Sequence, residues 1–290
     1  TFKADQDLWR DLAMLEKNHG SREKMLAVLH RAVEFCPEAD HLWVLAAKEE
    51  FTAGNLDAAR KIIAEAYKIS PHSEQIWLAA AKIEQTDGKF EDAAGLLKLG
   101  RQKAGSGRVW MKSAILERQL KHHAQELALL EEGTKLYPEF DKLWMMLGQY
   151  HERHNPVVAA AVAKTSLAMP GQTPSLPMGP PSLLPMAAPG IVDADKARAT
   201  YTQGLKHCVG SVRLWLCSIR YDERVNGFNS ARALCERARL RVPTAADLWT
   251  EAVRIERRSG NLTVAKQLCS RALQQFASCG LLWVELIETE

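Results

Sequence analysis

The chain has 290 residues, of which 47% are hydrophobic and 25% charged, and its formal net charge is +3 at pH 7. This composition is normal for a globular protein. So small a net charge does not by itself argue for a nucleic-acid or membrane partner. No apolar run approaches the ~20 residues of a membrane-spanning helix, and the opening residues, TFKADQDLWR, are not those of a signal peptide.

The chain contains six cysteines, and no two have the Cys-x-x-Cys spacing of a zinc ribbon or a thioredoxin-like site. In a chain of this size their uneven distribution fits reduced, intracellular thiols. The sequence begins without Met and ends at Glu290, in the middle of a repeated unit described below. We therefore expect the repeats to continue in a longer protein.

The first predicted element is a helix over residues 7–20. Trp9, Ala13 and Glu16 are spaced so that they share one face of this helix. Gly20 lies at its end, where glycine is favoured because it adopts left-handed backbone angles without strain. One apolar stripe of this helix is therefore expected to face the core.

The second predicted element is a helix over residues 21–36. Ser21 is a suitable N-cap for it. Pro37 follows and prevents the helix from continuing. The two helices are thus expected to form a pair joined by a short turn.

The same two-helix pattern recurs along the whole chain. Tryptophan marks it most clearly, because successive tryptophans are 34, 34, 33, 34, 71, 34 and 34 residues apart. A period in the low thirties is typical of proteins built from stacked helical repeats. The eight positions are Trp9, Trp43, Trp77, Trp110, Trp144, Trp215, Trp249 and Trp283.

Two further positions repeat with the tryptophan. The residue 23 positions after it is small, which predicts close backbone contact between helices: Ala32, Ala66, Gly100, Gly133, Ala238 and Ala272. The residue seven positions after it is glutamate in six units: Glu16, Glu50, Glu84, Glu117, Glu256 and Glu290. An enzyme needs a catalytic acid once, so this recurrence favours a structural partner for an arginine or backbone N–H of a neighbouring unit.

Stacking has a simple physical cause. One helix pair cannot bury its apolar face alone, so neighbouring pairs bury it between them. Each tryptophan can bury roughly 150–250 Å² of surface. We expect Trp→Ala in an internal unit to cost about 3–5 kcal/mol of stability.

The interval of 71 residues exceeds the usual 34 by 37. The second-helix sequence at 58–60, Ala-Ala-Arg, has its counterpart at 196–198, which is 37 residues later than expected. This predicts three parts: repeats over 1–155, a proline-rich insertion over 156–192 that splits one repeat, and repeats over 193–290. The insertion contains eight prolines. It is either an insertion at a tolerant turn or a docking segment.

The repeated Trp and Glu resemble those of HAT repeats, which are relatives of the tetratricopeptide repeat (TPR). A TPR has the pattern W-x-x-L-G-x-x-Y, and residues 144–150 match only its first part. Four stretches are similar to the HAT-repeat proteins of the spliceosomal tri-snRNP: LEKNHGSREKMLAVLHRAVEFCP (15–37), SEQIWLAAAKIE (73–84), KLWMMLGQYHE (142–152) and KARATYTQGLKHC (196–208).

This resemblance implies a role and a set of partners. The implied role is a non-catalytic scaffold of pre-mRNA splicing that bridges snRNP particles within the tri-snRNP. The implied partners are spliceosomal snRNP proteins in the nucleus, with RNA contact indirect or minor and with no membrane, small-molecule substrate or cofactor. The implied fold is an all-α, right-handed α-α superhelix, a HAT/TPR-like solenoid of about seven helix pairs plus a terminal half-pair.

Sequence motifs that would indicate a catalytic or ligand-binding site are weak. Residues 100–105 have the glycine spacing of a phosphate-binding loop but lack its lysine, and the histidines of HERH at 151–154 are three apart rather than the four of a metalloprotease helix. Cys235 and Cys269 occupy a repeat position that is elsewhere aliphatic, so we expect them in the core. We predict no catalytic, cofactor or metal site.

One surface pattern predicts partner binding. Arginines that lie five or nine residues after a tryptophan would align on the first helices of adjacent units: Arg153, Arg220, Arg224, Arg254 and Arg258. Such a basic stripe would contact an acidic protein segment or an RNA backbone. The alternative is a solvated face that is neutralised by Glu152, Glu223 and Glu256.

Two other functions remain open beside the splicing scaffold. One is another RNA-processing HAT scaffold, such as a cleavage and polyadenylation factor. The other is a TPR-like peptide receptor. Direct RNA binding is disfavoured, because aromatic residues for base stacking are lacking outside the core positions and the net charge is small.

Overall fold

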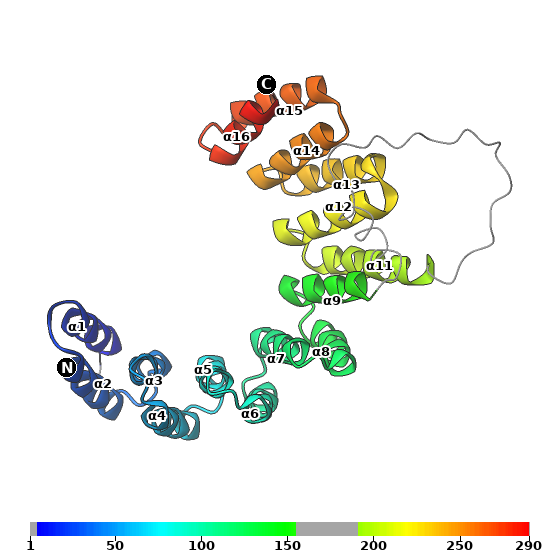
Figure 1. The fold of residues 1–290 in the computed structure, drawn as a ribbon. Coiled ribbons are helices and arrows are strands. Elements are labelled where there is room, and N and C mark those ends of the chain that lie inside the picture. The colour runs from blue at the N-terminus through cyan, green and yellow to red at the C-terminus, as the bar shows by residue number, and fades with distance from the viewer. Residues whose placement is uncertain (1–4, 155–190, 290) are drawn as a thin grey trace. The chain divides into compact units, whose positions relative to one another are not determined.

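The computed structural model describes residues 5–154 and 191–289, without the side chains of 191–195. These residues form fifteen α-helices, and the described ranges contain no strand (Figure 1). They group into two compact units that divide between Tyr137 and Pro138. The all-α repeat architecture predicted from the sequence is confirmed.

The first unit consists of four helix pairs (Figure 1). Within a pair the two helices pack side by side, and each second helix also packs against the first helix of the next pair. First helices contact one another as well, since α5 packs against both α3 and α7. The helices are α1 (Gln6–His19), α2 (Arg22–Phe35), α3 (Asp40–Thr52), α4 (Leu56–Ile69), α5 (Glu74–Thr86), α6 (Phe90–Lys103), α7 (Gly107–Gln119) and α8 (His123–Leu136).

The second unit consists of three pairs and a single helix, within the residues that the structure describes. Its first helices also form a contact series, from α9 to α12, α14 and α16. The two units thus contain the seven pairs and the half-pair predicted from the sequence. The helices are α9 (Asp141–Arg153), α11 (Ile191–His207), α12 (Val212–Asn226), α13 (Phe228–Arg241), α14 (Ala246–Arg258), α15 (Leu262–Gln275) and α16 (Gly280–Thr289).

The fifth pair joins α9 to α11, which pack against each other although they are far apart in sequence. The proline-rich segment predicted at 156–192 lies outside the described residues, apart from its last two, which belong to α11. The three-part division at 155 and 192 therefore stays a prediction.

The ends of the helices follow from a few local residues. Ser21 caps α2 as predicted, because its hydroxyl accepts a bond from the Lys24 N–H at 3.3 Å. Within a pair, Gly54, Gly88 and Gly260 turn the chain with φ of 80–85°. The next residue then donates its N–H to the carbonyl of the repeated glutamate, closing the helix end as in a Schellman motif: Asn55 to Glu50, Lys89 to Glu84 and Asn261 to Glu256, at 2.9–3.0 Å.

Each pair has a core position where its two helices meet. In the fifth pair Gly148 of α9 faces Tyr201 of α11, and a Cβ added to Gly148 would overlap the tyrosine ring. Tyr201 is fully buried. Cys235 and Cys269 are also buried in the core, as predicted.

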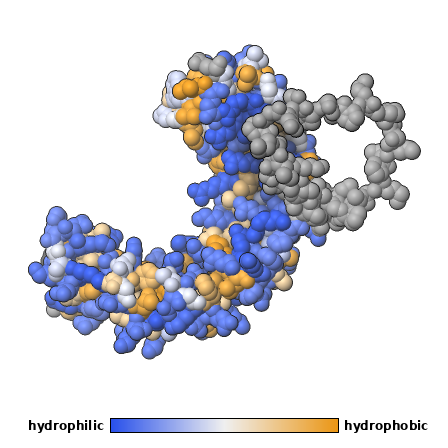
Figure 2. All heavy atoms as spheres, viewed as in Figure 1, coloured by the Kyte–Doolittle hydropathy of each residue, from blue (hydrophilic) through white to orange (hydrophobic). Residues whose placement is uncertain are grey.

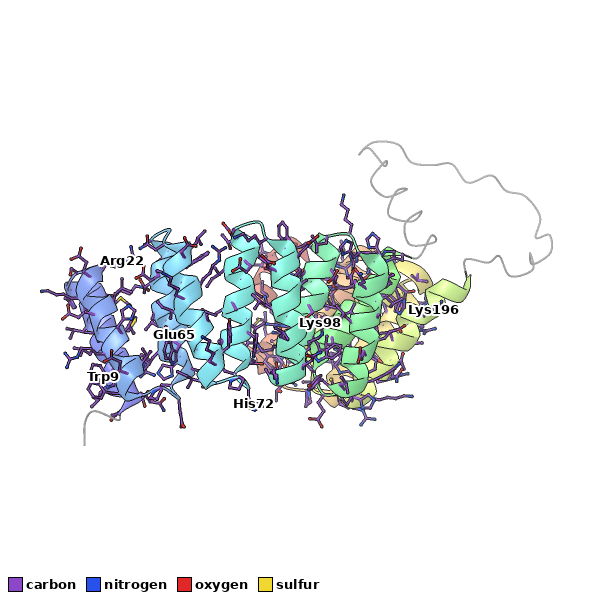
Figure 3. The ribbon with its side chains drawn as sticks, turned by 90° about the horizontal axis from the view of Figure 1, so that it is seen from below. Trp9, Arg22, Glu65, His72, Lys98 and Lys196 are labelled. Carbon is purple, nitrogen blue, oxygen red and sulfur yellow. The ribbon has the colours of Figure 1, made fainter. Side chains whose placement is uncertain are left out.

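The apolar residues are mostly enclosed by this stacking. On the face of the first unit shown in Figure 2, hydrophilic residues predominate and apolar residues gather in smaller patches. Figure 3 views the same unit from the side of its second helices, where Glu65 and Lys98 are labelled on α4 and α6. The first helices form the other layer, and the candidate binding surface lies there.

Candidate functional site

Five of the repeated tryptophans tie the turn before their first helix to the core. The indole N–H of Trp77 donates to the carbonyl of Pro71, six residues earlier, at 2.7 Å. Trp43, Trp144, Trp215 and Trp283 make the same bond with Pro37, Pro138, Val209 and Ala277. The prolines that stop the second helices thus also supply the acceptor that a buried indole N–H requires.

Burial of the tryptophan side chains differs between units. Five of them are only 5–7% exposed, whereas Trp283 is 48% exposed. Trp9 and Trp249 are partly buried. Trp9 stacks on Phe35 with 5.8 Å between ring centroids. The five most buried are Trp43, Trp77, Trp110, Trp144 and Trp215.

The small residue 23 positions after the tryptophan packs against that tryptophan. A Cβ on Gly100 would lie 3.0 Å from the Cβ of Trp77. In the fifth pair Gly204 takes this position once the 37-residue surplus is subtracted, and a Cβ on it would lie 2.7 Å from the Cβ of Trp144. Close contact at this position is confirmed for Gly100 and Gly204, whereas contact between two backbones stays a prediction. The nearest atoms belong to the tryptophan side chain, which is large enough to leave no room there.

A third repeated position supplies a side chain that stacks on the next tryptophan. We did not predict this position from the sequence. The residue 24 positions after one tryptophan stacks on the ring of the following one. Tyr67 lies 5.3 Å from the Trp77 ring, and Arg239 lies 4.3 Å from the Trp249 ring. An aromatic or guanidinium plane serves equally well there, so residue type alone does not reveal the position.

In two units the repeated glutamate joins its pair to the pair before it through two hydrogen bonds from an arginine. Arg60 of α4 forms two hydrogen bonds with Glu84 of α5, at 2.8 and 2.9 Å. Arg232 of α13 binds Glu256 of α14 in the same way, at 2.6 and 2.9 Å. In both cases the two residues are 24 apart in sequence.

The remaining acids at this position have other surroundings. Glu50 accepts a bond from Asn55 at 2.8 Å, and Glu117 lies 2.9 Å from a ring nitrogen of His122. Asp222, which replaces the glutamate, lies 3.3 Å from Arg198, again 24 residues earlier. Glu16 is partly buried on α1. Glu290 lies outside the described residues.

The five arginines of the predicted basic stripe lie in the second unit, and four of them form ion pairs with carboxylates. Arg220 pairs with Glu251 at 2.9 Å and Arg254 pairs with Glu285 at 2.6 Å. The other partners are Glu152 for Arg224, and Glu223 and Glu251 for Arg258. Arg153 donates to the Gln149 carbonyl at 3.2 Å and lies 5.9 Å from the Tyr150 ring.

These ion pairs determine how much of the positive charge of the stripe is neutralised within the chain. Glu152 and Glu223 neutralise it as the alternative interpretation expected, whereas Glu256 binds Arg232 instead. Partner binding by the stripe stays a prediction, and it would require a partner to compete with internal carboxylates.

Electrostatics favour the internal pairs. Burial pushes the pKa of Glu251 up, but hydrogen bonds from Arg220 and Arg258 outweigh burial and hold that pKa below the ordinary 4.5. The hydrogen bond to Glu251 in turn raises the pKa of Arg220. Glu251 is only 1% exposed, so a charge there depends on its two arginines.

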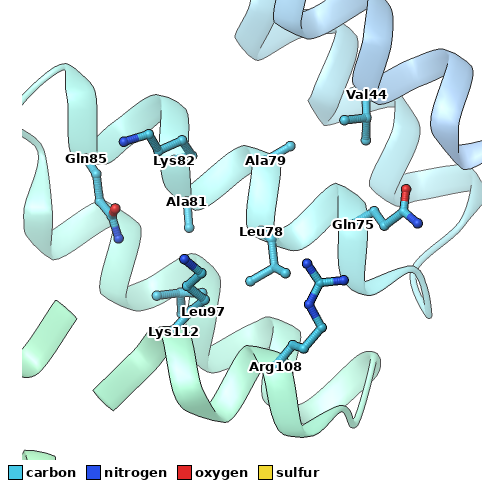
Figure 4. Close-up of a pocket in the computed structure, with 10 residues that line it drawn as sticks. All are labelled: Val44, Gln75, Leu78, Ala79, Ala81, Lys82, Gln85, Leu97, Arg108 and Lys112. Carbon is cyan, nitrogen blue, oxygen red and sulfur yellow. The ribbon is translucent and has the colours of Figure 1, made fainter. Parts of the chain in front are cut away.

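The first unit contains a pocket of about 500 Å³ along its first helices (Figure 4). Aliphatic side chains of α3, α5 and α6 form much of its wall: Val44, Leu78, Ala79, Ala81 and Leu97. Its charged residues are all cations, namely Lys82 of α5 and Arg108 and Lys112 of α7. In Figure 4 Arg108 and Lys112 extend from α7 toward α5. A pocket of this size can hold side chains of a bound peptide.

In the described ranges, 5–154 and 191–289, no three His, Cys, Asp or Glu side chains are grouped as a metal site would need. Every helix there is too short or too polar to cross a membrane.

Comparison with known proteins identifies the type of repeat. The family model described as tetratricopeptide repeat matches residues 40–83, which include α3 and α4. Protein STABILIZED1 of Arabidopsis thaliana is 50% identical over 52 residues, which are 18% of this chain and 5% of that relative. The chain thus corresponds to a small part of this relative's length.

One solved structure supports the fold. Yeast Tom70 superposes with a TM-score of 0.50 at 12% identity, covering 98% of this chain and 56% of that one. Pseudomonas aeruginosa pilF has a TM-score of 0.47 at 14% identity, covering 87% and 96% of the two chains. At such identities similarity shows only the fold.

The fold and the surface together define a class of protein. This chain is a TPR-like helical-repeat protein, and such solenoids typically present long surfaces to other proteins. Its interior contains the repeated tryptophan and the small residue packed against it, and in two units an Arg–Glu pair 24 residues apart joins neighbouring pairs. In the first-helix layer of the second unit, Arg220 and Arg254 pair with carboxylates of the following pair, whereas Lys82 and Lys112 line a pocket in the first unit.

Sequence reasoning missed two of the acids that pair with the arginine stripe. Glu251 and Glu285 each lie two residues after a tryptophan, and their partners Arg220 and Arg254 lie five residues after the preceding one. This shared register was present in the sequence. It could have been found by comparing positions in adjacent units rather than within one helix.

Proposed function

We propose that this chain is a non-catalytic scaffold of pre-mRNA splicing, which acts in the nucleus and bridges snRNP particles within the tri-snRNP through protein contacts. The observation that carries this proposal is the similarity of its repeats to pre-mRNA-processing factor six, a HAT-repeat protein of the tri-snRNP. That similarity runs through stretches such as 15–37 and 196–208. RNA contact is indirect or minor in this proposal.

The TPR-like fold supports the scaffold role. Stacked helix pairs expose first helices one after another, so several partner segments can bind along one chain. The pocket between α3, α5 and α7 gives one such surface a defined place. Membrane attachment, a small-molecule substrate and a cofactor have no part in this proposal.

The test is affinity purification of the tagged full-length protein from nuclear extract, with and without nuclease. Mass spectrometry and RNA blotting identify what is recovered. We expect proteins of both tri-snRNP particles, and we expect the protein partners to persist after nuclease. Recovery of cleavage and polyadenylation factors instead would assign the chain to another RNA-processing scaffold, and recovery of chaperones would favour a peptide receptor.

A further inference from the structure

Adjacent first helices meet in the same register at two places in the second unit. The residue five positions after one tryptophan faces the residue two positions after the next. In the second unit this register places Arg220 beside Glu251 and Arg254 beside Glu285. Each of these arginines thus meets a carboxylate from the following pair.

The same register brings two cations together in the first unit. Lys82 lies five residues after Trp77, and Lys112 lies two residues after Trp110. Both line the pocket between α3, α5 and α7. Where these two contacts of the second unit have Arg and Glu, the contact of α5 with α7 therefore has Lys and Lys.

Neither lysine is neutralised within the described part of the chain. No hydrogen bond or ion pair of either ammonium group occurs there, and both residues are exposed. The third cation of the pocket, Arg108, pairs with Glu74 at 2.9 Å, and no Asp or Glu lines the pocket. Two like charges that line one pocket repel each other, and an anion bound between them would relieve that repulsion.

The rest of the pocket indicates what kind of anion fits. Its wall is aliphatic, with Leu78 and Ala79 of α5 at the centre of Figure 4. It offers no aromatic side chain for stacking a nucleobase, which single-stranded RNA binding usually employs. The second unit shows that a carboxylate matches this register. An acidic side chain next to an apolar one therefore fits better than a phosphate backbone.

We propose that the pocket formed by α3, α5 and α7 binds an acidic segment of a partner protein. A carboxylate of that segment lies between Lys82 and Lys112, and a neighbouring apolar side chain packs on Leu78 and Ala79. This inference rests on the proposed scaffold function and gives it a site and a partner chemistry. The partner supplies the acid that the second unit carries within its own repeats.

The test combines peptide selection with one substitution and a matched control. Short random peptides displayed on phage are selected on the chain, on Lys112→Glu and on Lys98→Glu. Lys98 is an exposed lysine of α6 that does not line the pocket, so its substitution changes the net charge equally (Figure 3). We expect net-acidic peptides with an apolar residue to be enriched on the parent chain and on Lys98→Glu, but not on Lys112→Glu.

Two quantities sharpen the result. For a selected peptide measured by fluorescence anisotropy, Lys112→Glu should weaken binding about tenfold or more, whereas Lys98→Glu should change it about twofold at most. Lys112→Glu recreates the pairing of opposite charges found in the second unit. It should therefore raise the melting temperature by about 1–3 °C while binding is lost.

Three outcomes would overturn the proposal. They are no enrichment of acidic peptides, equal loss of binding in both variants, and displacement of the peptide by a single-stranded RNA oligonucleotide. The experiments distinguish a failure of the splicing-scaffold proposal from a failure of the acidic-segment site. Recovery of tri-snRNP proteins without acidic-peptide enrichment would leave the scaffold and remove this site, and the reverse result would leave the site and remove the splicing role.

Discussion

At the scale of single residues, the core is held by complementary volumes across each helix pair. One such combination consists of the residue four positions after the tryptophan, on the first helix, and the residue 20 positions after it, on the second. These two residues are Ala47 and Ile63 in the second pair, and Ala81 and Leu97 in the third. In the fifth pair the first member is Gly148 and the second, after the 37-residue offset, is the much larger Tyr201. One position has shrunk where the other has grown, as close packing requires.

This complementarity predicts a rescue. Gly148→Ala should cost about 1–3 kcal/mol of the free energy of unfolding, because its methyl group overlaps the Tyr201 ring. Adding Tyr201→Leu recreates the Ala–Leu pair of α5 and α6 and should restore part of that loss. Urea unfolding followed by circular dichroism of both single variants and the double variant measures the coupling.

The control is another glycine in a helix. Gly95 of α6 has no atom within 4 Å of an added Cβ, so Gly95→Ala should stabilise the chain by roughly 0.5–1 kcal/mol. Strict additivity of Gly148→Ala and Tyr201→Leu would contradict the packing argument. It would mean that the two side chains do not share one space.

Only some of these packing residues could be predicted from the sequence. The repeated tryptophan, glutamate and small residue were visible because each keeps its type from unit to unit. The Gly148–Tyr201 pair could not be recognised in the sequence, because both residue types differ from those of the other units. Only the summed volume of the two side chains is kept. A search for repeated residues detects the first kind of constraint and passes over the second.

At the scale of helices, the Arg–Glu pairs link each second helix to the first helix that follows. Arg232 binds Glu256, and this hydrogen bond holds the pKa of Glu256 below its ordinary 4.5. The unfolded chain binds a proton at this residue near pH 4.5, whereas the folded chain does so only at lower pH. The pair therefore stabilises the fold above that pH, and this contribution is lost as pH falls through the folded pKa.

We expect Glu256→Gln to lower the free energy of unfolding by about 1–3 kcal/mol at neutral pH. It should also flatten the decline of stability below about pH 4.5. Arg232→Met should flatten the same decline, because it removes the cause of the lowered pKa. Urea unfolding at several pH values between about 7 and about 3 follows both effects. If Arg232→Met kept the parental pH dependence, the arginine would not be the cause.

The helices themselves were predictable because local patterns agree on them. Apolar spacing, an N-cap such as Ser21 and a turn glycine such as Gly54 all point to the same boundaries. The ion pairs between helices were harder to predict. An arginine can reach several carboxylates, and only the packed register decides that Arg258 binds Glu223 and Glu251 while Arg232 binds Glu256.

At the scale of the whole molecule, the repeat period predicted the number of helix pairs but not their grouping. The interval from Trp110 to Trp144 is 34 residues, the usual value, yet the two compact units divide between them. The period depends on the length of a helix pair. The grouping depends on how well one pair packs on the next, and spacing alone does not contain that information.

A solenoid is stabilised mainly by contacts between neighbouring pairs, so damage should stay local. Trp77 is 5% exposed and lies between α4, α5 and α6 through its contacts with Tyr67, Pro71 and Gly100. Trp77→Ala should cost about 3–5 kcal/mol. Hydrogen exchange should then speed up in α4 to α7, while the amides of α12 to α14 keep their parental rates.

Trp283→Ala provides the comparison, because this tryptophan is already 48% exposed. Its loss should cost about 1–2 kcal/mol at most, and any faster exchange should be confined to α15 and α16. Faster exchange throughout the chain after Trp77→Ala would show that the pairs unfold as one cooperative body. In that case stability would not be a sum of neighbour contacts, and a partner bound at the first unit would stabilise every other surface of the scaffold as well.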